Sequence, residues 1–155
     1  MNRQKTTFKA GSKILLEDFD TRSTSGTSKK EARQVCEENS GAIGNLSYRL
    51  YAENKRSVLI VLQGMDTAGK DGAIRHIMQG VNAQATEVHP FKKPSSLELD
   101  HDFLWRIYQK VPARGNIGIF NRSHYEDVLV VRVHNLVPRE EWAARYDRIN
   151  DFEKL

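Results

Sequence analysis

The stretch Ser57-Val-Leu-Ile-Val-Leu-Gln-Gly-Met-Asp-Thr-Ala-Gly-Lys70 decides the fold. Its first half is a continuous aliphatic run, the pattern of a central parallel strand that is buried on both faces. Its second half has the spacing of a phosphate-binding loop: a glycine, four further residues, and then Gly-Lys. Because a helix is expected directly afterwards, over residues 71–79, the stretch predicts an α/β fold in which a P-loop follows the first strand.

Strand and helix patterns continue to alternate outside this stretch. We expect strands over residues 86–89 and 116–121, an amphipathic helix over residues 96–111, and one or two helices between residues 29 and 54. A last helix should begin at Pro138, with Trp142, Tyr146, Ile149 and Phe152 on one face. The sequence therefore predicts a parallel sheet with flanking helices. Three strands are fewer than the roughly five of an ordinary sheet, so we expect the sheet to be incomplete in this chain.

Composition indicates a soluble protein of the cytoplasm. The chain has 155 residues, of which 39% are hydrophobic and 28% charged. No apolar run approaches the roughly 20 residues that a membrane helix needs, and residues 1–10 lack a signal-peptide pattern, so we expect no membrane partner. The single cysteine, Cys36, fits a reducing compartment.

The basic charge is confined to the N-terminal part of the chain. Residues 1–56 carry eleven Lys and Arg against seven Asp and Glu, whereas residues 57–155 carry thirteen of each. Small polar residues dominate positions 20–30, so we interpret residues 1–30 as a flexible basic segment and residues 31–155 as one partial P-loop domain. Basic and aromatic residues do not alternate regularly, and we expect no nucleic-acid partner.

The phosphate loop, residues 64–70, is the strongest candidate site. Its backbone N–H groups and the positive end of the next helix can cradle an anion, and Lys70 can reach outer phosphate oxygens. The alternative is a glycine turn with a surface lysine. The residues expected to contribute to the cradle are Gly64, Thr67, Ala68 and Gly69.

Two carboxylates in or beside this loop are unusual. Asp71 follows Lys70, where ordinary nucleoside-triphosphate loops have a Ser or Thr for magnesium, and Asp66 lies within the loop. Phosphates repel carboxylates unless a cation lies between them, so Asp66 is predicted to hold Mg²⁺ or to orient Lys70. Asp71 either contributes to the phosphate site or merely caps the helix.

A second motif, residues 120–133, follows the strand expected at residues 116–121. Ligands of open α/β sheets bind at the carboxyl ends of strands, so Asn121 and Arg122 should face the site, with the Arg122 fork on phosphate oxygens. The alternative is a structural Arg122 paired with a local carboxylate such as Asp127. Asp127 is also the candidate for a second magnesium ligand, although it could be a surface charge.

Other charged residues are weaker candidates. Arg132 could reach phosphate from the helix after this strand, and Lys92 could line a polyanion channel together with Lys93 and Arg106. The alternative for Arg132 is a surface salt bridge, and the alternative for the other three is an ordinary solvated charge. For His124 the sequence identifies no acidic partner, and we expect no phosphohistidine, because phosphoryl transfer to a nucleotide needs no covalent intermediate.

Gly64-Met-Asp-Thr-Ala-Gly-Lys-Asp-Gly72 and Phe120-Asn-Arg-Ser-His-Tyr-Glu-Asp-Val-Leu-Val-Val-Arg-Val133 together resemble the polyphosphate kinase 2 family, as do Phe91-Lys-Lys-Pro94 and His101-Asp-Phe-Leu-Trp-Arg106. The similarity runs from about residue 32 to the chain end. It implies a thymidylate-kinase-like fold and Mg²⁺-dependent phosphoryl transfer between inorganic polyphosphate and nucleoside mono- or diphosphates, with adenine as the expected base. It also implies a homo-oligomer. The residues it places at the family's active-site positions are Asp66, Lys70, Asn121, Arg122, Asp127 and Arg132.

The family continues with a lid helix pair and further strands, so the resemblance implies a chain without its lid. Three other functions stay open on sequence grounds. The first is an ATP-dependent nucleotide or small-molecule kinase. The second is an inactive phosphate-binding fragment or assembly module, and the third is a polyanion-binding protein without chemistry. The last would tolerate loss of Asp66, because removal of an acid should strengthen anion binding.

Overall fold

The computed structural model describes residues 9, 11–20, 22–24 and 26–155. The chain divides into two compact units between Asn39 and Ser40. The first unit contains the short helix η1 (Leu16–Asp18) and the beginning of α1 (Lys29–Glu53). Within the segment predicted to be flexible, residues 1–8, 10, 21 and 25 lie outside the described residues, and the flexibility of the segment stays a prediction.

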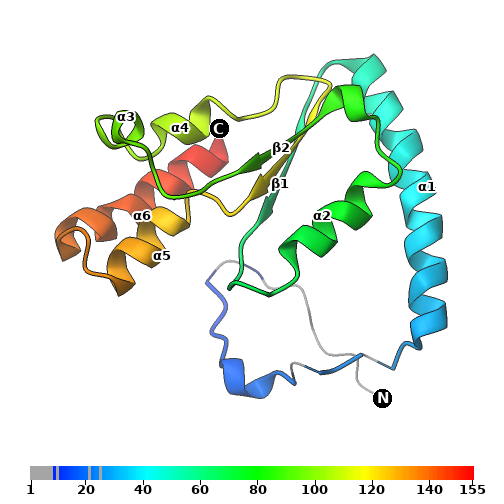
Figure 1. Ribbon diagram of the computed structural model, residues 1–155, viewed down its shortest axis with the longest axis horizontal. Helices are drawn as coiled ribbons and strands as arrows, with labels where there is room; N and C mark the ends of the chain where they lie inside the picture. The colour runs from blue at the N-terminus through cyan, green and yellow to red at the C-terminus, as the bar shows by residue number, and fades with distance from the viewer. Residues whose placement is uncertain (1–8, 10, 21, 25) are drawn as a thin grey trace. The chain divides into compact units, whose positions relative to one another are not determined.

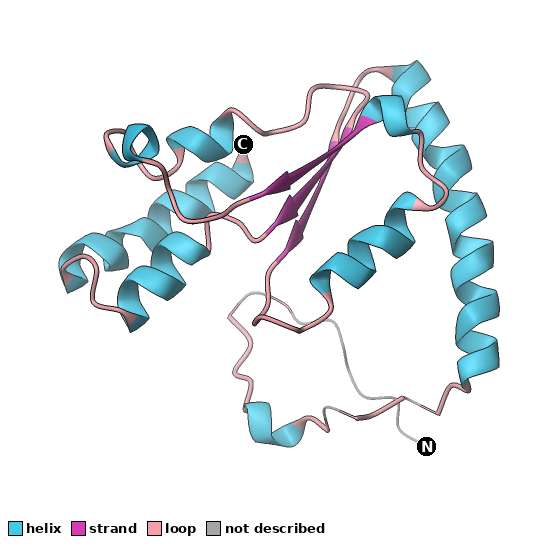
Figure 2. Ribbon diagram, in the orientation of Figure 1, coloured by secondary structure: helices cyan, strands magenta, loops and turns pink. Residues whose placement is uncertain are grey.

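The sheet of the second unit has three parallel strands, β1 (Val58–Leu62), β2 (Thr86–Pro90) and β3 (Ile117–Asn121). Their order is β1-β3-β2, and Leu62 and Pro90 both pair with Asn121, so all three strands end at the same edge (Figure 2). The parallel sheet expected from the sequence is confirmed. The prediction that the first strand is central is wrong. The central strand is β3, which is fully buried up to Phe120, whereas β1 is an edge strand and only partly buried.

Helices cover both faces of this sheet. Within residues 40–155, α2 (Lys70–Met78) lies on one side, and α4 (Trp105–Tyr108), α5 (Glu126–Val133) and α6 (Arg139–Lys154) lie on the other (Figure 1). The expected helix after Pro138 is therefore present, with Ile149 and Phe152 buried. Pro138 itself is the cap before the first helical residue. None of the described helices is long and apolar enough to cross a membrane.

The prediction of a single helix over residues 96–111 is wrong. The structure has two short helices instead, α3 (Ser96–Leu99) and α4. Ser95 and Glu98 form a capping box at the start of α3, and an Asp102 carboxylate oxygen accepts a hydrogen bond from the Leu104 amide at 3.0 Å. Such side-chain bonds to the backbone compete with a continuous helix, which explains the break.

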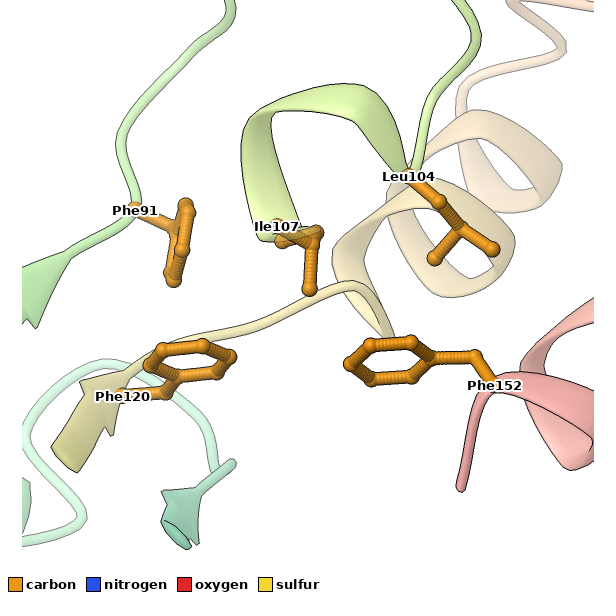
Figure 3. Close-up of a cluster of buried hydrophobic side chains, with 5 residues drawn as sticks. All are labelled: Phe91, Leu104, Ile107, Phe120 and Phe152. Atoms are coloured by element: carbon orange, nitrogen blue, oxygen red, sulfur yellow. The ribbon is translucent and has the colours of Figure 1, made fainter. Parts of the chain in front are cut away.

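An apolar cluster attaches α4 and α6 to the sheet (Figure 3). Phe91, which follows β2, meets Phe120 of β3 edge to face, with 4.8 Å between ring centroids. Full burial of a side chain of this size stabilises a fold by about 2 kcal/mol. The cluster thereby fixes the segments that leave β2 and β3, which carry the candidate site. Its members are Phe91, Leu104, Ile107, Phe120 and Phe152.

One glycine of β3 is required by packing. A Cβ on Gly118 would lie 2.9 Å from Cδ of Pro112, closer than atoms of this kind approach one another. The ring of Pro112 therefore packs directly on the strand backbone. This contact holds the segment before β3 against the sheet.

Candidate functional site

The phosphate loop joins β1 to α2. Gly69 has φ of 91° and Thr67 has φ of 67°, both in the left-handed region, and α2 begins at Lys70. The Lys70 ammonium group donates hydrogen bonds to the carbonyl oxygens of Gly64 and Met65, each at 2.8 Å. The lysine thus lies back across its own loop, in the position from which it can meet an anion held by the loop amides.

The two sequence motifs meet at the carboxyl edge of the sheet. The Arg122 guanidinium donates to the carboxylate of Asp66 at 2.5 Å, and the Asn121 side-chain amide donates to Asp71 at 2.7 Å. The Asp66 side chain is 82% exposed. These contacts follow from the pairing of Leu62 with Asn121, which places the end of β3 beside the loop that leaves β1.

Arg122 itself has an unusual backbone. Its φ of 63° lies in the left-handed region, and its amide donates to the carbonyl oxygen of Leu62 at 3.0 Å. Its guanidinium also lies 3.9 Å from Glu126. Strained backbone of this kind is concentrated at functional sites. The sequence alternative was an Arg122 paired with a local carboxylate such as Asp127; the local partner in the structure is Glu126, and Arg122 also pairs with Asp66 across the sheet edge.

Two polar residues of this region were missed by sequence reasoning. The Gln63 amide donates to Glu126 at 2.5 Å and accepts a hydrogen bond from the Ser123 hydroxyl at 3.1 Å. Ser123 is fully buried. Gln63 therefore fixes the start of α5 against the end of β1. Its position directly after the aliphatic run of β1 was the signal that could have indicated this role.

Asp127 lies in a different set of contacts. Its carboxylate is 3.3 Å from Arg106 and 3.9 Å from Arg145, and its backbone carbonyl accepts a hydrogen bond from Arg145 at 2.8 Å. Burial raises the pKa of Asp127, although the two arginines act to lower it. The structure thus joins Asp127 to α4 and α6, and its role as a metal ligand stays a prediction.

The contacts recorded for the remaining candidates are with residues outside the phosphate loop. The guanidinium of Arg132 lies 5.1 Å from the ring centroid of Trp142, on the exposed side of α5. Lys92 is exposed, and its carbonyl oxygen accepts a hydrogen bond from Arg106 at 2.9 Å. His124, for which no acidic partner was identified from sequence, is buried with Nε2 3.2 Å from a carboxylate oxygen of Glu153.

A cavity of about 630 Å³ opens beside Arg122. We call it the large cavity. Its wall combines apolar side chains with charged groups that converge from the segment after β2 and from α4, α5 and α6. Apolar walls with a few oriented charges are typical of small-molecule sites. Among the lining residues are Phe91, Lys92, Arg106, Arg122, Val130, Leu136 and Arg145.

The acidic residues allow a particular kind of magnesium site. Within the part of the chain that the structure describes, no three His, Cys, Asp or Glu side chains gather into a metal cage. Mg²⁺ at phosphate sites needs no such cage, because one or two carboxylates and the phosphates themselves hold it. Asp66 and Asp71, both on the phosphate loop side of the sheet edge, fit that arrangement.

The chain is similar in sequence to known proteins. A family model described as polyphosphate kinase 2 matches residues 26–155. An AMP/ADP-polyphosphate phosphotransferase of Meiothermus ruber is 55% identical over 106 residues, which are 68% of this chain and 40% of that protein. An ADP-polyphosphate phosphotransferase of Rhodopseudomonas palustris is 48% identical over 124 residues, 72% of this chain and 43% of that protein.

Solved structures give the same result. The crystal structure of polyphosphate kinase 2 from Arthrobacter aurescens TC1 matches with a TM-score of 0.88 and 40% identity, over 93% of this chain and 53% of that one. The chain thus spans less than half the length of the two curated relatives and about half of this crystallised protein.

Proposed function

Because the chain belongs to the polyphosphate kinase 2 family, we propose that it forms part of an enzyme that transfers a phosphoryl group between inorganic polyphosphate and a nucleoside mono- or diphosphate. The relatives named above are phosphotransferases for AMP and ADP, so adenine nucleotides are the proposed acceptors. The observation that carries the proposal is the contact of Arg122 with Asp66 at 2.5 Å. It brings a phosphate-binding fork to the loop that holds Lys70.

This phosphoryl transfer requires the protein only to position the two substrates and to neutralise charge. An oxygen of the acceptor phosphate, already anionic at neutral pH, attacks the terminal phosphorus of polyphosphate. The bond from that phosphorus to the bridging oxygen breaks, and the shortened chain keeps the electron pair. No general base is required, because the attacking oxygen carries no proton.

Each group of the site has a role in this proposal. Lys70 and the loop amides bind the transferred phosphoryl group, and Arg122 neutralises charge that develops on its oxygens. Asp66 and Asp71 would hold Mg²⁺, which supplies further charge neutralisation when it is bound. The large cavity beside Arg122 would accommodate the acceptor nucleotide.

The direct test is magnesium-dependent formation of ATP from ADP, and of ADP from AMP, with polyphosphate as the donor. We expect Lys70→Ala and Asp66→Asn each to lower turnover by at least about 100-fold. Asp100→Asn, an exposed acid outside the phosphate loop and the second motif, is the matched control and should keep full turnover.

Other results would support one of the alternative functions or overturn the proposal. Turnover with ATP as the obligatory donor would indicate an ATP-dependent kinase. Polyphosphate binding that needs Lys70 but gives no turnover would indicate a phosphate-binding module without chemistry. Binding that survives Asp66→Asn unchanged or strengthened, again without turnover, would indicate a polyanion-binding protein. Absence of both binding and turnover would overturn the proposal.

A further inference from the structure

Arg122 lies between two carboxylates that differ in their exposure to solvent. One guanidinium nitrogen, Nη2, donates to Asp66 at 2.5 Å, and the other, Nη1, lies 3.9 Å from Glu126. The Asp66 side chain is 82% exposed, whereas the Glu126 side chain is only 18% exposed. The partner on the phosphate loop is therefore open to exchange with solvent and ligands, and the partner at the start of α5 is enclosed.

The enclosed partner, Glu126, is itself held by Gln63. Oε1 of the Glu126 carboxylate accepts a hydrogen bond from the Gln63 side-chain amide at 2.5 Å, and Oε2 is the oxygen nearest to Arg122. The two oxygens of this carboxylate thus serve two different partners. Gln63 directly precedes Gly64, the first residue of the phosphate loop, so its amide connects the loop to the helix that follows Arg122.

A series of hydrogen bonds fixes the orientation of the Gln63 amide. The Ser123 hydroxyl donates to the Gln63 side-chain oxygen at 3.1 Å and accepts a hydrogen bond from the Tyr125 backbone amide at 3.2 Å. An ionised carboxylate can only accept, so Gln63 presents its NH₂ group to Glu126 and its oxygen to Ser123. Because Ser123 is fully buried, reversal of the amide would leave its hydroxyl hydrogen without an acceptor.

A bound phosphate and Asp66 compete for the Arg122 guanidinium. In the proposed reaction the nitrogen that now donates to Asp66 must be shared with, or released to, a phosphate oxygen at the same loop. The Arg122 side chain is long and 39% exposed, so release from Asp66 would free it to adopt other rotamers. The contact with Glu126 uses the other nitrogen and can persist through this exchange.

We propose that Gln63 is a positioning residue for phosphoryl transfer: it holds the Glu126 carboxylate, which keeps Arg122 at the phosphate loop when a phosphate takes the place of Asp66. This inference rests on the proposed function, which supplies the phosphate. An ion pair at 3.9 Å between partly exposed groups contributes little by itself. A carboxylate already fixed by Gln63 loses less freedom on pairing, and therefore holds Arg122 more effectively.

The experiment is a double-mutant cycle between Gln63→Met and Arg122→Gly, with tripolyphosphate as the probe and EDTA in place of magnesium. Methionine is unbranched like glutamine but has no hydrogen to donate to Glu126. Gln63→Met should weaken tripolyphosphate binding about fivefold in the unchanged background, and should have no further effect when Arg122 is already glycine. Gln84→Met, the same change at an exposed position, is the matched control and should leave binding unchanged.

Glu126→Gln tests the same contact without altering Gln63. Its amide oxygen can still accept the hydrogen bond from Gln63, but the charge that holds Arg122 is lost. Removal of an acid beside an anion site would, by electrostatics alone, strengthen binding of tripolyphosphate. We expect about threefold weaker binding instead, with strengthening only in the Arg122→Gly background. Denaturant unfolding of each variant establishes that the fold is retained.

Two kinds of result would overturn the inference. One is tripolyphosphate affinity that Gln63→Met leaves unchanged, or lowers equally with and without Arg122; an equal loss would give Gln63 a structural role only. The other is stronger binding by Glu126→Gln in the presence of Arg122. Because binding is measured without turnover, failure here is distinct from failure of the proposed function, which the turnover of Lys70→Ala and Asp66→Asn decides.

Discussion

At the scale of single residues, Arg122 combines an unfavourable left-handed backbone conformation with a side chain that reaches the phosphate loop. A left-handed backbone costs a residue other than glycine about 1 kcal/mol. The ion pair with Asp66 offsets little of this, because both side chains are substantially exposed. The cost is therefore better explained by the direction in which this backbone aims the guanidinium, toward Asp66 on the phosphate loop.

Arg122→Gly should separate stability from function. Glycine relieves the backbone cost, so we expect the free energy of unfolding to be unchanged or to rise by about 1 kcal/mol. Turnover should fall by about 1,000-fold, because the transferred group loses the guanidinium that neutralises the charge developing on its oxygens. Denaturant unfolding and the polyphosphate assay measure the two quantities.

Asn135→Gly provides the comparison for this variant. Asn135 is also left-handed, with φ of 51°, and is exposed beyond the end of α5. The Asn135→Gly variant should have a slightly higher free energy of unfolding and keep full turnover. A marked loss of stability in Arg122→Gly alone would mean that the contacts of Arg122, rather than its backbone conformation, dominate its contribution to the fold.

At the scale of elements, Asp127 is the junction of three helices. From the second residue of α5 it binds Arg106 of α4 and Arg145 of α6, and its side chain is only 12% exposed. Removal of one member of a buried ion pair leaves the others without compensation and typically costs about 3 kcal/mol. Asp127→Asn should therefore lower the free energy of unfolding by about that amount, as measured by denaturant unfolding.

Asp102→Asn is the matched change at an exposed pair. Asp102 meets Arg148 at 3.2 Å, with both side chains more than half exposed, and its loss should cost less than about 1 kcal/mol. If Asp127→Asn abolished turnover with no more loss of stability than Asp102→Asn, the junction would be unimportant. The metal-ligand prediction for Asp127 would then be favoured.

Contacts that follow from the pairing of strands could be predicted from the sequence, whereas contacts that depend on the packing of helices could not. Asp66 and Asn121 could be expected at one edge because parallel strands end together, and the structure has them there. The partners of Asp127 could not be expected, because Arg145 reaches it only through the packing of α6 on α5, which no local pattern encodes. The break between α3 and α4 was missed because the apolar spacing continues through capping residues such as Asp102.

At the scale of the whole molecule, His124 makes the stability of the fold depend on pH. The ring is fully buried and meets Phe152 of α6 edge to face, and its Nδ1 has no hydrogen-bond partner among the described residues. Burial lowers the pKa of His124 below its ordinary value of 6.5, although Glu153 and Asp127 act to raise it. The unfolded chain therefore takes up a proton on this ring at a higher pH than the folded chain does.

The stability that depends on neutral His124 is fully present above pH 6.5 and declines as the pH falls from there toward the lower folded pKa. His124→Gln should flatten this decline, whereas His134→Gln, at an exposed histidine, should leave it unchanged. Tyr125, whose pKa burial raises to about 12, does not titrate in this range. Burial also raises the pKa of Asp127, which acts in the opposite direction. Denaturant unfolding on either side of pH 6.5 gives the change in the free energy of unfolding with pH for each variant. The difference between the two changes is therefore the contribution of His124. Equal slopes in both variants would show that protonation of this ring does not control the stability of the molecule.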